Sequence, residues 1–241
     1  MSSPKAIIIG ATSGIGRALA KEMANHGYEL GLTGRRVNLL AELQQELTIE
    51  SHLRAMDVTK PEEARQILGE LVEEMGGMDV IVLNSGVGTI DPSWESEKRV
   101  IEVNVVGFVA LANWAMAYFT ERGGGHIVGI SSIAALKGYG RTPAYCASKA
   151  FISTYMQGLQ QKANKKRLGI TVTDIKPGFV ATPMTEKNKG MFWVAPVEKA
   201  ARQIYRAIAR RKRYVYITRR WRIVGWITKA IPDWLYVRLR V

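Results

Sequence analysis

The 241-residue sequence contains one cysteine, Cys146, and only three histidines. A lone cysteine excludes an intramolecular disulfide scaffold, and a reducing compartment therefore fits the chain best. The histidines do not fall in the spacing of a metal site, so no bound metal is expected. The sequence also lacks a secretory signal pattern and any run of roughly 20 uncharged apolar residues, which a membrane-spanning helix needs. We therefore expect a cytoplasmic protein.

Acidic residues are nearly absent from the C-terminal end of the chain. Residues 201–241 contain 12 lysines and arginines but only one acidic residue, Asp233, whereas residues 1–200 contain 22 basic and 20 acidic residues. The net charge of +13 therefore divides into +2 for the first 200 residues and +11 for the last 41. Because the excess is confined to the tail, it does not indicate a nucleic-acid-binding domain.

A regular alternation of short apolar runs and helical patterns fills the rest of the chain. Seven runs predict strands, at residues 5–10, 28–33, 51–56, 79–84, 126–131, 170–177 and 213–218. Helical patterns lie between them, at Ile15–Gly27, Val37–Leu47, Pro61–Met75 and Ala144–Leu168. This rhythm predicts an α/β fold, a single doubly wound Rossmann-type domain with a seven-stranded parallel sheet. We assign residues 1–218 to this domain and residues 219–241 to a basic, tryptophan-rich extension.

A glycine-rich turn joins the first predicted strand to the first predicted helix. Its residues are Gly10, Ala11, Thr12, Ser13, Gly14, Ile15 and Gly16. Glycines at such a junction let the backbone approach a phosphate, and the N-terminus of the helix directs N–H groups and a positive dipole end at it. A tight turn without a ligand is the alternative. The position of the turn at the opening of a strand-helix-strand unit is typical of a dinucleotide site.

Two arginines, Arg35 and Arg36, follow the second predicted strand, where a site for NAD usually places an acidic residue. An arginine fork can instead pair with a 2′-phosphate, so this replacement favours NADP(H) over NAD(H). Arg35, nearer the strand end, is the stronger candidate, with Ser13 as its helper. The alternative is that the arginines are solvated residues at the start of a helix.

Tyr145 and Lys149 are four residues apart in a predicted helix and therefore share one face. A cation about 4 Å from a phenol, at an effective dielectric near 20, contributes roughly 4 kcal/mol and lowers the phenol pKa toward neutrality. That would bring the tyrosine into range for acid–base catalysis. Taken alone, the pair has the alternative of a packed tyrosine beside an exposed lysine.

Seven motifs, in order along the chain, carry a resemblance to a known family. They are Gly10-x-x-x-Gly14-x-Gly16, Asp57-Val58, Asn84-Ser85-Gly86, Asn104, Ser131-Ser132, Tyr145-Cys146-Ala147-Ser148-Lys149 and Pro177-Gly178-Phe179-Val180-Ala181-Thr182. Their order and approximate spacing resemble the classical short-chain dehydrogenases/reductases over about residues 5–210. The resemblance implies an NADP(H)-binding oxidoreductase.

The resemblance also implies roles for single residues. Tyr145 would be the general acid that protonates a carbonyl oxygen, and Lys149 would hold the nicotinamide ribose and lower the tyrosine pKa. Ser132 would hydrogen-bond the substrate oxygen, and Asn104 would anchor a water behind Lys149. The resemblance implies further cofactor contacts for Asp57, Val58, Asn84, Gly86, Pro177, Gly178, Val180 and Thr182.

The resemblance also implies roles for two further segments, a dimer interface and a substrate lid. Val105–Phe119 is apolar on nearly every side, and in the resembled family this helix and the tyrosine helix form a dimer interface, so a homodimer or homotetramer is expected. Met184–Val194 lies where the family keeps a mobile substrate lid. Its Met184, Met191, Phe192 and Trp193 either line the pocket or only pack the lid down.

The C-terminal extension predicts an amphipathic helix that ends at Pro232. Ile223, Trp226, Ile227, Ala230 and Ile231 fall near one face, with Arg219, Arg222 and Lys229 away from it. Tryptophan and basic residues beside an apolar stripe are typical of a helix that lies on a membrane surface, here peripheral at the inner face. The main alternative is that the stripe covers apolar surface of its own domain or of a dimer mate. Nucleic acid is the least favoured partner.

The sequence therefore predicts an NADP(H)-dependent oxidoreductase that interconverts a carbonyl and a secondary alcohol, as a reductase of a lipophilic keto substrate. The alternative is a non-catalytic NADP-sensing or membrane-associated scaffold protein. That alternative would predict the loss of a catalytic group, whereas Asn104, Ser132, Tyr145 and Lys149 are all present.

Overall fold

The computed structural model describes residues 3–186, 188 and 190–239. Lys187 and Lys189 of the predicted lid, and residues 240–241 of the predicted extension, lie outside the described residues. Seven strands form one parallel sheet in the order β3-β2-β1-β4-β5-β6-β7. The strands are β1 (Lys5–Ile9), β2 (Glu29–Gly34), β3 (Ser51–Ala55), β4 (Val80–Leu83), β5 (Gly125–Ile130), β6 (Ile170–Pro177) and β7 (Tyr214–Ile217). The predicted Rossmann-type sheet is confirmed.

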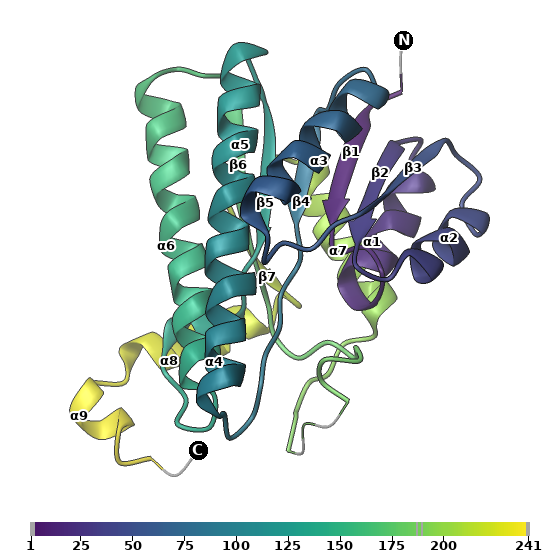
Figure 1. Ribbon diagram of the computed structural model, residues 1–241. Coiled ribbons are helices and arrows are strands. Elements are labelled where there is room, and N and C mark those ends of the chain that lie inside the picture. Colours follow the sequence, from purple (N-terminus) through teal and green to yellow (C-terminus); the bar gives the residue numbers. More distant parts are fainter. Residues whose placement is uncertain (1–2, 187, 189, 240–241) are drawn as a thin grey trace.

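Helices cover both faces of this sheet (Figure 1). They are α1 (Gly14–Ala24), α2 (Val37–Gln45), α3 (Pro61–Glu74), α4 (Trp94–Ile101), the π-helical η1 (Glu102–Gly107), α5 (Phe108–Glu121), the 3-10 helix η2 (Ile133–Leu136), α6 (Pro143–Lys165), α7 (Val197–Ala209), α8 (Trp221–Ala230) and α9 (Asp233–Tyr236). The four helices predicted by residue range are present, with ends that differ by up to three residues.

The core consists of two apolar layers, one on each face of the sheet. On one face Leu19 of α1 and Ile204 of α7 pack against the sheet, and on the other Leu68 of α3 and Ile152 of α6 do so. Strands that are buried on both faces are nearly continuous apolar runs, as in Val80–Leu83, where every residue is buried. This explains why the strands could be predicted from short apolar runs without alternation.

Residues Trp94–Glu121 form one continuous helix built from α4, η1 and α5. Within the described part of the chain it is the one helix long and apolar enough to cross a membrane, but half of its most apolar stretch is buried inside the domain. Its inner side belongs to the core layer formed with α3 and α6. We therefore interpret it as a core helix. Its π-helical turn contains Asn104, and such turns are frequent at functional sites.

The carboxyl ends of the strands define the functional edge of the domain. The strand order changes direction after β3, because the chain returns to place β4 on the free side of β1. This creates a crevice between the turns that follow β1 and β4. In Figure 1 the strand arrows end at the lower edge, where α8 and α9 also lie. Helices α8 and α9 therefore lie at the edge of the sheet where ligands bind in such folds.

Candidate active site

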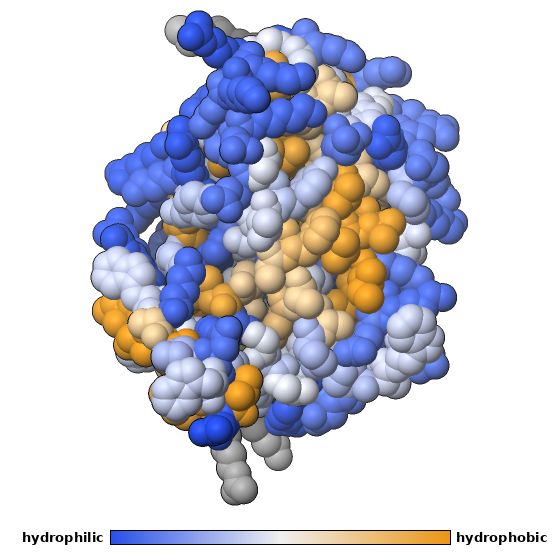
Figure 2. Space-filling model, turned by 90° about the vertical axis from the view of Figure 1, so that its left-hand side faces the viewer, coloured by the Kyte–Doolittle hydropathy of each residue, from blue (hydrophilic) through white to orange (hydrophobic). Residues whose placement is uncertain are grey.

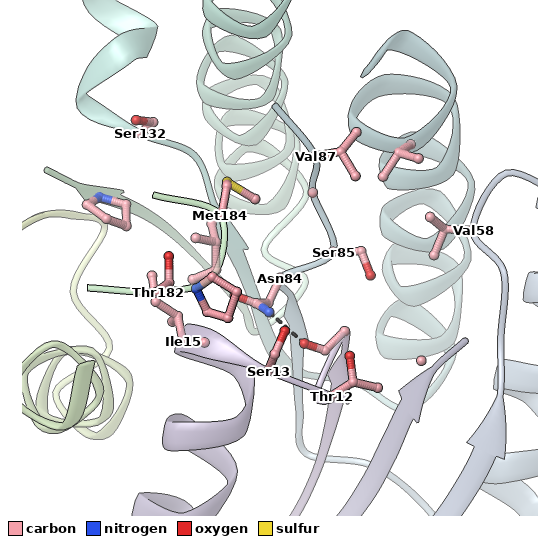
Figure 3. A pocket seen from close by; sticks show the side chains of 18 of the residues that line it. Thr12, Ser13, Ile15, Val58, Asn84, Ser85, Val87, Ser132, Thr182 and Met184 are labelled. Atoms are coloured by element: carbon pink, nitrogen blue, oxygen red, sulfur yellow. Dashed lines mark hydrogen bonds between the residues drawn. The ribbon is translucent and has the colours of Figure 1, made fainter. Parts of the chain in front are cut away.

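A cleft of about 260 Å³ opens at the carboxyl ends of the strands. Every residue predicted for the site lines it except Gly16 and Asn104. Residues from β2, β5, β6 and α6 and from the turns that follow β1, β3 and β4 contribute to its walls, so segments far apart in the sequence meet here. Figure 3 shows the glycine turn side of the cleft with Thr12, Ser13 and Asn84, and Ser132 at the far side.

The glycine turn is held by bonds from two neighbouring strands. The backbone N–H groups of Gly10 and Ala11 donate to the Thr33 carbonyl at 3.0 and 2.9 Å. The Asn84 amide donates to the Gly10 carbonyl at 2.8 Å, the bond drawn dashed in Figure 3. Gly10 has φ of +88°, which favours glycine. Asn84 thus fixes the turn.

Gly16 lies beneath this turn and leaves no room for a side chain. A Cβ there would be 2.2 Å from the Gly10 carbonyl oxygen and 2.5 Å from Nδ2 of Asn84. The predicted cofactor role of Gly16 is therefore indirect in this structure, because the residue lets the helix pack under the turn without reaching the cleft.

Gly16→Ala is expected to lower the free energy of unfolding by about 1–3 kcal/mol, because the added methyl group must displace backbone. The matched control is Gly158→Ala, since Gly158 is an exposed residue of α6 with no atom within 4 Å of an added Cβ. The control should instead stabilise the protein by up to about 1 kcal/mol. Urea denaturation of both variants measures the difference, and equal stabilities would contradict the packing at Gly16.

The arginine contact with the glycine turn differs from the prediction. The guanidinium of Arg36 donates to Thr12 Oγ1 at 2.8 Å and to Ser13 Oγ at 3.0 Å. Arg35, the predicted partner of Ser13, also lines the cleft. The reason is local geometry. Because β1 and β2 are neighbours in the sheet, the residue that starts α2 lies beside the β1–α1 turn, and its side chain reaches back over it.

Arg35 acts instead on the carboxylate of Asp57 from the β3–α3 turn. Burial works to raise the pKa of Asp57, but hydrogen bonds from the Thr59 backbone and hydroxyl, together with the charge of Arg35, outweigh it and lower that pKa. The Thr59 bonds are 3.0 and 2.9 Å long. The carboxylate is therefore ionised at neutral pH on the β2–β3 side of the cleft.

Ser132, Tyr145 and Lys149 meet on the opposite side of the cleft. Ser132 lies between β5 and η2, and its Oγ accepts a hydrogen bond from the Ala134 N–H at 3.1 Å. Tyr145 and Lys149 project from one face of α6, as predicted, with the Lys149 ammonium 5.7 Å from the centre of the phenol ring. Lys149 Nζ also donates to the Ile130 carbonyl at 3.0 Å.

The environment of this pair shifts both pKa values. Burial raises the pKa of Tyr145, and the Ser132 hydroxyl opposes that shift. The expected lowering of this pKa by Lys149 is therefore wrong, because burial of the phenol outweighs it. Burial lowers the pKa of Lys149 to about 8, against the opposing charge of Asp174. At neutral pH the phenol is therefore protonated and can donate, while the ammonium beside it can stabilise the phenolate that donation leaves.

Asn104 lies behind the cleft and is fully buried. Its Oδ1 accepts from the Val87 N–H at 2.8 Å, and its Nδ2 donates to the Val87 carbonyl at 2.8 Å and to Ser148 Oγ at 3.0 Å. These bonds fix the segment after β4 against α6. The side chain acts here as a structural clamp, and its role in a proton relay stays a prediction.

A buried polar cluster that the sequence analysis missed lies on β6 beside Lys149. The Asp174 carboxylate accepts from Ser131 Oγ, from Ser153 Oγ at 2.7 Å and from the ammonium of Lys176, with which it forms an ion pair. Ser153 lies one turn beyond Lys149 on α6. The signal was present in the sequence, since a buried strand with opposite charges two residues apart brings both to one face.

The predicted lid divides into two parts in the described residues. Met184 lines the cleft, which fits the pocket-lining alternative. Phe192 and Trp193 instead pack on Trp221 at centre-to-centre distances of 5.0 and 6.1 Å, which fits the packing alternative. Sequence reasoning also missed further lining residues that neighbour the motifs, namely Gly34, Met56, Ser85, Val87, Val103, Ile130, Pro183 and Thr185.

Comparisons with known proteins agree on one family. A sequence model described as short chain dehydrogenase matches residues 4–191. An uncharacterized oxidoreductase of Myxococcus xanthus is 37% identical over 197 residues, which cover 78% of this chain and 76% of that protein.

Solved structures show the same fold. A short-chain dehydrogenase from Sphingobium yanoikuyae in complex with NADPH has a TM-score of 0.79 at 23% identity, over 95% of this chain and 97% of that one. A short chain dehydrogenase/reductase from Burkholderia phymatum in complex with NAD has a TM-score of 0.83 at 21% identity, over 96% of this chain and 97% of that one. The two neighbours thus bind different nicotinamide dinucleotides.

Proposed function

This chain belongs to the short-chain dehydrogenase family, and from that membership we propose that it interconverts a carbonyl and a secondary alcohol with NADP(H) as hydride carrier. The observation that carries the proposal is the convergence of Ser132, Tyr145 and Lys149 on the cleft that the glycine turn also lines. The resemblance to this family that the seven motifs carry is confirmed. The family match and the related oxidoreductases identify the chain as an oxidoreductase.

The residues that line the cleft have the chemistry that a bound dinucleotide needs. Gly14 has a positive φ at the N-terminus of α1, where the first N–H groups of the helix have no intrahelical partner and suit a pyrophosphate. Gly86 lies close to Lys149 and Asn104, with 3.3 Å from the position of an added Cβ to Lys149 Nζ, so only a glycine lets a ribose approach the lysine there. These features support the cofactor roles predicted for the glycines and for Lys149.

When bound, NADPH supplies the hydride that reaches the carbonyl carbon. The chain's own residues act on the carbonyl oxygen. Tyr145, which burial keeps protonated, donates its phenolic proton to that oxygen, and the Ser132 hydroxyl donates a hydrogen bond to it. The Lys149 ammonium stabilises the phenolate that remains.

We further propose that the cleft prefers NADP(H), which carries a 2′-phosphate, over NAD(H). The hydroxyls of Thr12 and Ser13 and the Arg36 guanidinium form one cluster, and Arg35 lines the same part of the cleft. Hydroxyl and guanidinium donors together suit a 2′-phosphate of charge near −2. The geometry supports Arg36 as the main phosphate contact.

NADPH is expected to bind at least about tenfold more tightly than NADH, a difference of about 1.4 kcal/mol. Arg36→Ala should remove most of this preference by weakening NADPH and leaving NADH nearly unchanged. Arg202→Ala is the matched control, because Arg202 is an exposed arginine of α7 outside the cleft. Fluorescence titration of the three proteins with both cofactors measures the dissociation constants, and equal affinities of the wild-type protein for NADPH and NADH would remove the arginine argument.

We propose a lipophilic ketone as the substrate class, because Val87, Val180 and Met184 are apolar residues that line the same cleft as the reacting groups. NADPH oxidation over a panel of lipophilic ketones tests this. A protein that binds NADPH but oxidises it with none of them would favour the non-catalytic alternative.

We also propose that the chain forms at least a homodimer through the α4–α6 side. Ile101, Val106 and Phe151 are exposed there although the helices that bear them are otherwise packed in the core layer. Figure 2 shows apolar side chains gathered across this face. Light scattering of the protein in solution tests this assembly, and a monomer would contradict it.

A further inference from the structure

The C-terminal helix α8 turns its apolar face away from the domain. Trp221 and Gly225 are buried against it, whereas Ile223, Trp226 and Ile227 are 54, 57 and 58% exposed. A surface helix normally points its apolar stripe at the core. The apolar stripe predicted from the sequence therefore does not cover its own domain. The alternative prediction, that these three residues pack on their own domain, is wrong.

The short helix α9 extends the same kind of surface. Trp234 is 65% exposed and Val237, directly after the helix, is 77% exposed. Figure 2 shows hydrophobic residues with strongly hydrophilic ones beside them toward the lower edge of the molecule. We call the exposed side chains of Ile223, Trp226, Ile227, Trp234 and Val237 the tail surface. A grouping of this kind on a folded protein indicates an interaction site.

Positive charge borders the tail surface. The basic residues of this region that the structure describes are Arg219, Arg220, Arg222, Lys229 and Arg238, and none of them forms an ion pair within the described residues. Asp233, the acidic residue of the region, is paired with Lys137. The Arg222 guanidinium lies 4.6 Å from the centre of the Trp226 ring, so charge and apolar surface adjoin.

Helices α8 and α9, which carry the tail surface, pack against the edge of the domain that contains the cleft. Trp221 packs on Phe179 of the nicotinamide motif at 5.4 Å between ring centres. A Cβ on Gly225 would touch Leu136, and the Tyr236 hydroxyl donates to the Gly138 carbonyl at 2.8 Å. Leu136 and Gly138 belong to the segment that follows Ser132. The helix is thus positioned by the substrate side of the active site.

We infer that the tail surface docks on an anionic lipid bilayer, with the cleft edge of the domain close to the membrane. The five apolar side chains would enter the interface, and the unpaired arginines and lysine would contact lipid phosphates. Charge decides between the candidate partners. A second copy of the tail carries the same positive charge and would be repelled, whereas an anionic membrane is complementary to it. A nucleic acid would match the charge but leave the apolar side chains in water.

Sedimentation of the full-length protein with large unilamellar vesicles tests this inference independently of any reaction. We expect binding to vesicles of phosphatidylglycerol and phosphatidylcholine, at least tenfold weaker binding to vesicles of phosphatidylcholine alone, and weakening by added salt. Trp226→Ser combined with Ile227→Ser should reduce binding at least tenfold. The matched control is Trp94→Ser, because Trp94 is a 68% exposed tryptophan at the start of α4, outside the tail surface.

A charge-reversal pair tests the electrostatic part. Arg222→Glu with Lys229→Glu should reduce binding to anionic vesicles at least tenfold, whereas Lys162→Glu with Lys165→Glu, on the exposed C-terminal end of α6, should change it less than threefold. Since all these side chains are exposed, the melting temperatures should stay close to that of the wild-type protein, which shows that the variants fold.

Three outcomes would overturn the inference. The first is the absence of wild-type binding to anionic vesicles at physiological salt. The second is equal loss of binding in the Trp94→Ser control. The third is a smaller assembly in solution for the Trp226→Ser and Ile227→Ser variant with vesicle binding unchanged, which would show that a second copy covers the tail surface.

Discussion

Tyr145→Phe is expected to lower the rate of carbonyl reduction by a factor of about 10²–10⁴, the usual contribution of a positioned general acid. The affinity for NADPH should stay within about twofold of the wild-type value, because the lost phenolic oxygen acts on the substrate oxygen. The phenol is buried and protonated at neutral pH, with the Ser132 hydroxyl beside it and the Lys149 ammonium 5.7 Å from its ring centre. Steady-state rates together with fluorescence titration of NADPH measure both effects.

The matched control for this substitution is Tyr155→Phe. Tyr155 lies on the same helix, is packed against Phe151 and Phe108, and does not line the cleft. It should retain nearly full activity. Substantial turnover by Tyr145→Phe on the best substrate would show that another group protonates the carbonyl oxygen.

Lys149→Met should damage both turnover and NADPH binding. We expect a loss of at least about 10³-fold in kcat/KM, about 4 kcal/mol, and a loss of at least tenfold in NADPH affinity. The ammonium is buried between Ile130, Gly86 and Tyr145, where it can reach the ribose as well as the phenol. Lys162→Met, at an exposed position of the same helix, is the control and should behave like the wild-type protein. Unchanged NADPH binding by Lys149→Met would remove the ribose contact.

The pKa of Lys149 gives this variant a second readout. Burial lowers that pKa to about 8 in the folded protein, from 10.5 in the unfolded chain. Between these values the folded state binds fewer protons, so the wild-type protein should gain stability relative to Lys149→Met as the pH rises from 8 to 10.5. Urea denaturation of both proteins at pH values spanning this window measures the gain, and parallel stability curves would show that the lysine titrates normally.

The sheet and the cleft could be predicted because their signals are local. Buried parallel strands are short apolar runs, and the turns at their carboxyl ends meet at one edge. Once the order of strands is fixed, the residues at their carboxyl ends and directly after them must gather there, as Gly10, Asp57, Asn84, Ser132 and Pro177 do. Tyr145 and Lys149 share a helical face by spacing alone.

The details that were missed depend on the direction of single side chains. Arg35 and Arg36 are adjacent, and only the start of α2 decides which of them reaches Ser13. The Asp174–Lys176 pair needed knowledge of which face of β6 meets α6. A strand that is buried on both faces gives no such information, because its pattern does not alternate.

The direction in which the apolar face of α8 points could not be predicted from the sequence either. Periodicity predicts that Ile223, Trp226 and Ile227 share one face of a helix, but it is silent on whether that face meets the domain or the solvent. The structure decides through Trp221 and Gly225, which occupy the opposite face and pack on Phe179 and Leu136. The division of the chain at residue 218 into domain and extension stays a prediction.

Hydride transfer can be followed directly with NADPH that carries deuterium at the transferred position. The protein should be incubated with this cofactor and a panel of lipophilic ketones, and the products analysed by mass spectrometry. We predict a secondary alcohol that carries deuterium on the former carbonyl carbon, formed by the wild-type protein and nearly absent with Tyr145→Phe. A protein that binds NADPH yet forms no deuterated alcohol from any ketone would contradict the proposed reaction.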